Sequence, residues 1–400
     1  MSGRPISIED LARRAEVEAR FIVRALESGA LGRRGPDQLT EDDEAPVKML
    51  SLWESAGYSI DAIGRAIGEN RLSFTFLDAP SIRGMPRVET TYGDFAALRS
   101  LDLGAMRKLY EALGLEAPGP AEQMREGESD VLDLLAMLTA TGASEHAVLR
   151  LFRVYADALR RLGLAEAEFF EAEIERPARA AGSTEQDLLD LGVDIGHQVV
   201  PAIEKALLAI YQRHRHHVWL DHTLGHVEGA LDAAGLATAA TRPPSVAFVD
   251  LTGFTSLTEE LGDEAAADMS GRLASMVDTI SIGREGRPVR WLGDGGMFVF
   301  REPLAAVAAA LDVVREAPVR GLPPTHIGIH SGPVIFQDGD IYGRTVNLAA
   351  RLSALAGPGE VLVSAEIADS AGEIAHFDSI GPVELKGIAQ PIQVFRARLA

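Results

Sequence analysis

The chain has 400 residues, of which 46% are apolar and 24% charged, and it contains no cysteine. This size and composition fit two or three globular domains, and the lack of cysteine excludes disulfides, thiolate zinc sites and cysteine catalysis. A formal net charge of -21 argues against nucleic acid and anionic membrane as partners. Since the sequence has neither an apolar run long enough to span a membrane nor a recognisable signal peptide, we expect a cytoplasmic protein.

Residues 1–75 have the pattern of a small helical module. Apolar spacing predicts one helix from Ser7 to Leu26, which Gly29 ends, and Thr40 is placed to cap the next helix. The stretch weakly resembles the winged helix-turn-helix of MerR-type regulators. However, this module carries ten basic against thirteen acidic side chains, whereas a DNA reader presents a basic face. We therefore expect a regulatory module and no nucleic acid partner.

Residues 76–240 continue with helical periodicity and almost no strand pattern. Proline and glycine interrupt it at 118–120 and 182–183, and the last segment, 186–230, is long enough for one or two extended helices. The stretch 237–244 ends in Arg-Pro-Pro and breaks helix. We expect an all-helical regulatory and coupling region here, followed by a new domain at 245–400.

Five of the ten histidines fall near the end of that helical region, at His214, His216, His217, His222 and His226. Three interpretations are open. The cluster is a solvated helix surface, or a coupling helix that responds to pH through imidazole protonation, or a metal site, since His222 and His226 are four residues apart and share a helical face.

After Pro244 the sequence alternates between strand and helix patterns. We expect strands at 246–251, 289–292, 297–300, 327–330, 334–336 and around 361, with helices around 269–280 and at 304–314 and 345–355. Two βαβ-like halves sharing one sheet predict an α+β ferredoxin-like domain.

Two aspartates in this domain are placed for chemistry. Asp250 ends a predicted strand and precedes Thr252, Gly253 and Phe254, a turn whose backbone N–H groups are candidates to hold phosphate. Asp294 lies in a tight turn between two strands. Either aspartate alone is an ordinary strand-end or turn residue, but two convergent carboxylates form a minimal site for two Mg²⁺ or Mn²⁺ ions bound to a nucleoside triphosphate.

Four segments occur together in one order: FVDLTGFTSL at 248–257, VRWLGDGGMFVF at 289–300, IGIHSGPV at 327–334 and DIYGRTVNLAARL at 340–352. In combination they resemble the catalytic domain of class III adenylyl and guanylyl cyclases. The resemblance implies conversion of ATP to cyclic AMP and pyrophosphate with two divalent metal ions. It also implies a homodimer with two sites at its interface, each built from both chains, and we expect the N-terminal helices to regulate it.

The resemblance also implies roles for single residues. Asp250 and Asp294 match the metal ligands, and Asp340 matches the aspartate that accepts a hydrogen bond from the adenine amino group. Asn347 and Arg351, four residues apart on one helical face, match the pair that orients the ribose and stabilises charge on the α-phosphate. An arginine suits that task, because its charge is not lost by titration.

One position departs from the family pattern. Arg290 stands where adenylyl cyclases usually carry a lysine, and its planar guanidinium does not fill the place of an ammonium group. Arg290 and Asp340 suit N1 and the amino group of adenine, or O6 and N1–H of guanine in a shifted register. The glutamate and cysteine usual in guanylyl cyclases are missing, so we expect ATP. The alternatives are a guanylyl cyclase and a catalytically weak or inactive homologue that senses nucleotide.

Overall fold

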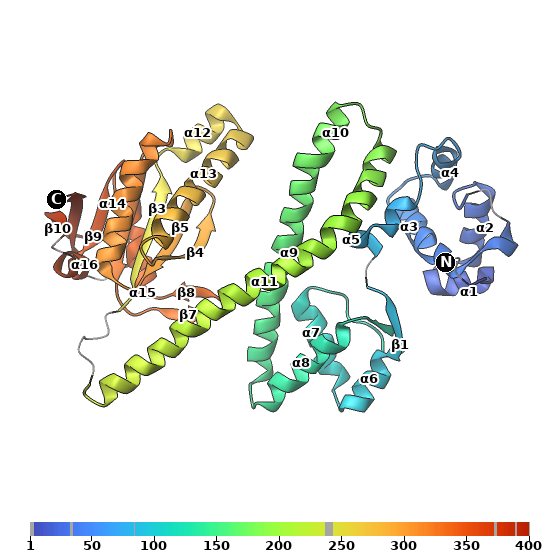
Figure 1. The fold of residues 1–400 in the computed structure, drawn as a ribbon, viewed down its shortest axis with the longest axis horizontal. Helices are drawn as coiled ribbons and strands as arrows, with labels where there is room; N and C mark the ends of the chain where they lie inside the picture. Colours follow the sequence, from blue (N-terminus) through green and yellow to red (C-terminus); the bar gives the residue numbers. More distant parts are fainter. Residues whose placement is uncertain are drawn as a thin grey trace. The chain divides into compact units, whose positions relative to one another are not determined.

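The computed structural model describes residues 4–32, 35–83, 85–236, 243–371, 374–388 and 390–399 (Figure 1). The chain divides into two compact units, Met1–Leu224 and Gly225–Ala400. Within the described ranges, no helix combines the length and hydropathy that a membrane span requires.

The first unit is predominantly helical, as predicted. Its helices are α1 Ile8–Ala15, α2 Ala19–Glu27, α3 Glu44–Ser55, α4 Ile60–Gly68, α5 Pro80–Arg83, α6 Tyr92–Arg99, α7 Leu103–Leu113, α8 Glu128–Ala140, α9 Glu145–Phe170, α10 Arg176–Ala180 and α11 Glu185–Ala233, the last of which runs past the unit boundary. The helical pattern did not predict a short antiparallel ribbon formed by β1 Arg87–Thr91 and β2 Gln123–Arg125. Short 3-10 turns occupy Pro36–Gln38, Glu41–Asp43 and Thr75–Asp78.

The single helix predicted from Ser7 to Leu26 is wrong. Ser7 caps α1 by accepting a hydrogen bond from the Asp10 N–H, at 3.1 Å. The backbone then turns at Glu16, whose φ of 58° is left-handed and ends α1. Leu11 and Ile22 from the two helices are fully buried in one core, so the apolar spacing reported a shared core and not one continuous helix. The resemblance to MerR-type regulators stays a prediction.

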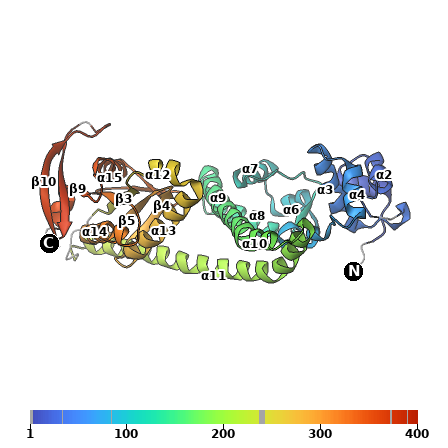
Figure 2. The same ribbon diagram turned by 90° about the horizontal axis from the view of Figure 1, so that it is seen from above.

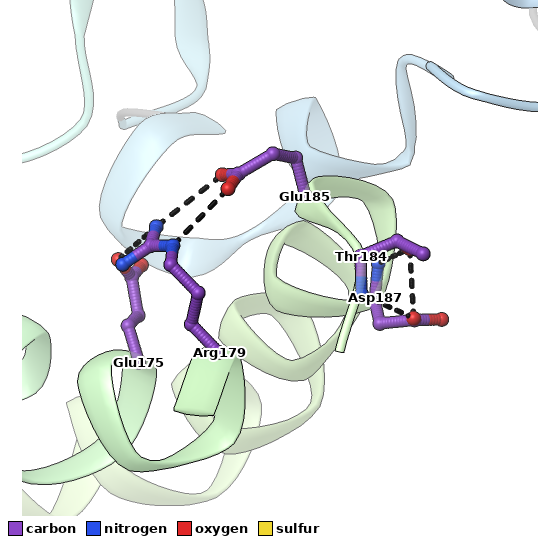
Figure 3. A network of polar contacts seen from close by, with 5 residues as sticks. All are labelled: Glu175, Arg179, Thr184, Glu185 and Asp187. Atoms are coloured by element: carbon purple, nitrogen blue, oxygen red, sulfur yellow. Dashed lines mark hydrogen bonds and ion pairs between the residues drawn. The ribbon is translucent and has the colours of Figure 1, made fainter. Parts of the chain in front are cut away.

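A tight turn separates α10 from α11, at the Gly182–Ser183 position that the sequence predicted. Figure 3 shows the polar contacts around it. Arg179 near the end of α10 pairs with Glu185 at the start of α11, with 3.1 Å between Nε and Oε1. Thr184 and Asp187 bond each other's backbone N–H groups, at 2.8 and 3.2 Å. This reciprocal capping fixes where α11 begins.

The predicted extended segment is one helix, α11, of 49 residues. The five clustered histidines lie on it and are exposed. Within the described residues, no group of three or more histidine, aspartate or glutamate side chains is arranged to hold a metal ion. The predicted helix-breaking stretch falls mostly on residues 237–242, which lie outside the described ranges.

The second unit is built on a seven-stranded mixed sheet in the order β10-β11-β9-β6-β3-β5-β4. All neighbouring strands are antiparallel except β6 and β9. A separate hairpin is formed by β7 and β8. The elements are β3 Ser245–Leu251, α12 Phe254–Leu261, α13 Asp263–Ile282, β4 Arg287–Leu292, β5 Gly295–Phe300, α14 Pro303–Val319, β6 Thr325–Ser331, β7 Ile335–Gln337, β8 Asp340–Tyr342, α15 Arg344–Leu355, β9 Val361–Ser364, α16 Ala365–Ser370, β10 Ala375–Val383 and β11 Ile392–Leu399.

Helices cover both faces of this sheet, with α15 on one face and α13 and α14 on the other (Figure 2). Side chains alternate between the faces along each strand. On β3, Ala247 and Val249 enter the core beneath α13 and α14, whereas Val246 and Phe248 pack on the α15 side. By the same alternation Asp250, the sixth residue of β3, belongs to the α15 side. The predicted α+β fold is confirmed.

Candidate active site

The two predicted metal ligands lie next to each other. Asp250 pairs with Gly295 across β3 and β5, so Asp294, one residue earlier in the β4–β5 turn, lies beside it. Partial burial together with the charge of Asp294 raises the pKa of Asp250 to about 6. Nε2 of His326, 3.9 Å from Oδ2 of Asp250, opposes that shift.

Glycine is required at the point where these carboxylates meet. A Cβ on Gly295 would lie 3.0 Å from the Val249 carbonyl oxygen and 3.1 Å from Oδ1 of Asp250. Gly293 in the same turn has a φ of 61°, which glycine adopts without strain. The turn is also fixed from α13, because the Ser270 hydroxyl donates to the Gly293 carbonyl. The sequence Gly-Asp-Gly-Gly therefore presents Asp294 to Asp250.

The predicted base-recognition residues are also brought together. Arg290 on β4 forms an ion pair with Asp340 at the start of β8. The other oxygen of Asp340, Oδ1, accepts a hydrogen bond from the Ile341 N–H at 2.8 Å. The carboxylate is held from two sides and its side chain is only 17% exposed, whereas Arg290 is 41% exposed. Asp340 is therefore held in place, and Arg290 is the more exposed member of the pair.

A cleft of about 390 Å³ is lined by Asp250, Asp294 and Arg290 together with residues of α15, whereas Asp340 does not line it. The residues that line it are Phe248, Val249, Asp250, Arg290, Asp294, Gly295, Gly296, Met297, Ile341, Tyr342, Gly343, Val346, Asn347, Ala350, Ser353 and Ala354. The cleft thus contains both carboxylates, the guanidinium of Arg290 and the amide of Asn347.

Arg351 is not placed in this cleft. It lies one helical turn after Asn347 on α15, it is exposed, and it does not line the cavity. Thr252, Gly253 and Phe254 do not line it either. Gly253 has a φ of 74° and caps α12, while Phe254 packs against the core, so this segment has only backbone groups and Thr252 to offer a phosphate. The Thr252 hydroxyl is buried without a hydrogen-bond partner among the described residues.

His326, which was not predicted from the sequence, lies beside Asp250. Its Nδ1 is within hydrogen-bond distance of the Ser353 carbonyl oxygen on α15, at 2.9 Å. The ring therefore connects the carboxylate pair to α15. Its position follows from the register of β3 against β6, where Asp250 pairs with His326. That register could be found only once β6 was known to be the neighbour of β3.

The carboxylate pair fits a divalent cation. Two partly buried, neighbouring carboxylates repel each other when both are ionised, as the raised pKa of Asp250 reports, and a bound cation would relieve that repulsion. Within the described residues the pair is not part of a larger ligand cluster. This donor set suits Mg²⁺, which proteins hold through one or two carboxylates while water and substrate phosphates complete the shell.

Comparison with known proteins identifies the C-terminal domain. Residues 238–396 match the family model described as the adenylate and guanylate cyclase catalytic domain. An uncharacterized protein of Mycobacterium tuberculosis is 28% identical over 87% of this chain and 89% of its own length. A protein from the same species named as a pH-sensitive adenylate cyclase is 27% identical over 74% of this chain and 75% of its own.

An adenylate cyclase of Glutamicibacter nicotianae is 28% identical over 71% of this chain and 72% of its own length. Among solved structures, the adenylyl cyclase CyaB of P. aeruginosa aligns with a TM-score of 0.37 at 25% identity, over 40% of this chain and 95% of its own. The C-terminal part of this chain, residues 238–396, belongs to the catalytic domain family of class III adenylyl and guanylyl cyclases.

Proposed function

We propose that the protein is an adenylyl cyclase, which converts ATP to cyclic AMP and pyrophosphate with two Mg²⁺ or Mn²⁺ ions. The observation that carries this proposal is the neighbouring pair Asp250 and Asp294, which lines a cleft together with Arg290 and Asn347. The relatives named adenylate cyclase support ATP as the substrate.

The reaction requires the ribose 3′-oxygen to attack the α-phosphorus in line while pyrophosphate leaves. Bound divalent ions supply acidification of the 3′-hydroxyl and neutralisation of the triphosphate charge. Asp250 and Asp294 hold that positive charge at one end of the cleft. Asn347 is placed to hydrogen-bond and orient the ribose, which lowers the entropy cost of the cyclisation.

Recognition of the base is assigned to Arg290 and Asp340. Asp340 is fixed by Ile341 and has acceptor capacity left for the adenine amino group. Arg290 pairs with it, so the base meets a combined donor and acceptor. This pairing also supports one alternative: if Arg290 stays bound to Asp340, adenine binds weakly and the domain is a slow cyclase or a nucleotide sensor.

The active unit is proposed to be a homodimer. Arg351 does not line the cleft of its own chain, so the fixed charge for the α-phosphate is assigned to Arg351 of a second copy. The β7–β8 hairpin also exposes two apolar side chains, Ile335 and Phe336, which are 63% and 65% exposed. Unpartnered apolar groups of that size are suited to a protein contact. The N-terminal helical region is proposed to regulate this dimer.

The test is turnover by the full-length protein with ATP or GTP and either metal ion, with cyclic nucleotide and pyrophosphate both measured. We expect cyclic AMP from ATP, little cyclic GMP from GTP, and neither product without metal. Preferred use of GTP would establish the guanylyl alternative. Nucleotide binding without turnover would establish the sensor, and Arg290→Lys should then restore some activity.

A further inference from the structure

A second cavity, of about 430 Å³, lies in the catalytic unit and shares no lining residue with the cleft. It is bounded by the end of β6, the first turn of α15, the start of α16 and β11. Its wall includes the polar side chains of His330, Arg344, Ser364 and Glu366. The proposed cyclase reaction uses none of them.

His330 is the buried polar group of this cavity, with a side chain only 10% exposed. Its Nδ1 bonds the Ser364 hydroxyl at 2.8 Å, whereas its Nε2 forms no hydrogen bond with any described residue. A hydroxyl can donate or accept, so the ring can present Nε2–H to the cavity without losing Ser364. The space beside Nε2 is kept open by Gly332, where a Cβ would lie 3.5 Å from Nε2 and 2.5 Å from the Thr345 hydroxyl.

Two further groups favour an anion here. Arg344 is exposed at the cavity wall, and the structure gives it no ion pair among the described residues. Arg344 also begins α15, a helix of 12 residues, whose first-turn N–H groups have no intrahelical acceptor and attract negative charge.

Burial and the charged groups around the cavity shift the pKa of His330 in opposite directions. Burial and the charge of Arg344 lower the pKa of His330, while Glu366, with Oε2 3.6 Å from Nδ1, raises it. Glu366 is 60% exposed, so solvent screens its repulsion of an anion. An anion beside Nε2 would favour the protonated ring, which donates from both nitrogens.

We propose that this cavity is a second, non-catalytic site that binds a compact oxyanion, a phosphate or carboxylate group, through Arg344, His330 Nε2 and the first turn of α15. The planar guanidinium matches two oxygens of such a group. The volume leaves room for a small organic substituent on the anion.

The test is calorimetric titration of the full-length protein with inorganic phosphate, without nucleotide and with EDTA, followed by the same titration with acetate. Arg344→Gln should weaken binding by about tenfold or more, because a charge-assisted hydrogen bond is lost. Glu366→Gln should tighten it by about two- to fivefold, because a nearby like charge is removed. Arg320→Gln, an exposed arginine on the same unit, should change nothing.

The site is supported if either probe binds more weakly to Arg344→Gln and more tightly to Glu366→Gln than to the unaltered protein. The probe with the higher affinity shows whether the site prefers phosphate or carboxylate. Equal affinity of Arg344→Gln and the unaltered protein would overturn the proposal, as would the absence of binding by both probes. An Arg351→Gln variant is the check on the proposed catalytic site: loss of binding in this variant, with Arg344→Gln unaffected, would also overturn the proposal. None of these readouts requires turnover.

Discussion

Asp250 and Asp294 lie side by side and repel each other when both are ionised, an arrangement that costs stability unless a cation is bound. Replacing either with asparagine keeps the shape and removes one ligand charge. We expect each variant to lose at least about 100-fold in turnover while its thermal unfolding stays near that of the unaltered protein. Asp268→Asn on α13, 71% exposed, is the matched control. Near-normal turnover of Asp250→Asn would refute its role as a metal ligand.

The raised pKa of Asp250 predicts how stability changes with pH in metal-free protein. Its folded value of about 6 lies above the ordinary 3.8, so the folded state holds the proton more tightly. The contribution of this proton to the free energy of unfolding is fully present below about pH 3.8 and is lost as the pH rises through about 6. The Asp250→Asn variant has no carboxyl group at this position, so its stability does not fall for this reason. Relative to the unaltered protein it should gain about 1 kcal/mol between pH 4 and pH 7, a value discounted because the side chain is 43% exposed.

Calorimetric unfolding in EDTA at several pH values measures that difference. In the same series, the stability difference between Asp268→Asn and the unaltered protein should not change with pH. A stability difference that does not change between pH 4 and pH 7 would contradict the burial and repulsion assigned to Asp250.

At the residue scale, sequence predicts side chains whose role depends on local position. Asp250 at a strand end and Asp294 in a Gly-rich turn could be predicted from the strand and turn patterns alone. The structure brings the two residues together. His326 and the ion pair of Arg290 with Asp340 could not be found this way. They depend on which strands are neighbours and on the path of the β7–β8 hairpin, which no local pattern encodes.

At the element scale, the position of α15 depends on one glycine. A Cβ on Gly328 of β6 would lie 2.0 Å from the Ser353 nitrogen and 2.4 Å from the Ala349 oxygen, so α15 and β6 touch backbone to backbone. Gly328→Ala should therefore push α15 away, cost about 1–3 kcal/mol, and lower turnover by about tenfold or more because Asn347 moves. Thermal unfolding and turnover are the two measurements.

Gly271→Ala is the control for that substitution. Gly271 lies within α13 and a Cβ there meets nothing within 4 Å, so alanine should be neutral or stabilising by about 0.5–1 kcal/mol. If Gly328→Ala behaves like Gly271→Ala, the close contact between β6 and α15 does not position the site.

The histidines of α11 give an element-scale test of regulation. They are exposed, which fits a solvated helix, and the pH-dependent interpretation stays a prediction. Replacing His214, His216, His217, His222 and His226 with glutamine in the full-length protein should flatten the change of activity between pH 7 and pH 5.5, because glutamine cannot gain a proton. His146→Gln with His197→Gln is the control. An unchanged pH profile would leave the cluster as a solvated surface.

Helices and strands were predicted well where their apolar residues follow a clear pattern. The strands β3 and β6 are buried along most of their length, the helices α13, α14 and α15 each bury one face, and their patterns show it. The break at Glu16 was missed because apolar residues of α1 and α2 keep a helical spacing across the turn. The strands β10 and β11 were missed because β10 is largely exposed and contains Gly381 and Pro382, which weaken a strand pattern.

At the scale of the whole molecule, the proposed site needs two chains. In the proposed homodimer each chain supplies Asp250, Asp294 and Asn347 to one site and Arg351 to the other, and a two-fold axis repeats this arrangement. One chain then cannot be active alone, and a damaged half can be complemented by an intact half from a partner. Such an arrangement is beyond the reach of local sequence patterns, because it concerns pairs of residues on different chains.

The decisive experiment mixes Asp250→Ala chains with Arg351→Ala chains, each with its own affinity tag. Either variant alone should be inactive. In an equal mixture that has exchanged fully, half of the dimers are mixed, and each mixed dimer keeps one intact site of two, so activity should return to about a quarter of the unaltered level. Mixing Asp250→Ala with Asp294→Ala is the control and should restore nothing, because both substitutions damage the same half of the site. If dimers isolated through both tags contain Asp250→Ala and Arg351→Ala chains and are still inactive, the site does not span two chains, and Arg351 must act in the cleft of its own chain or not at all.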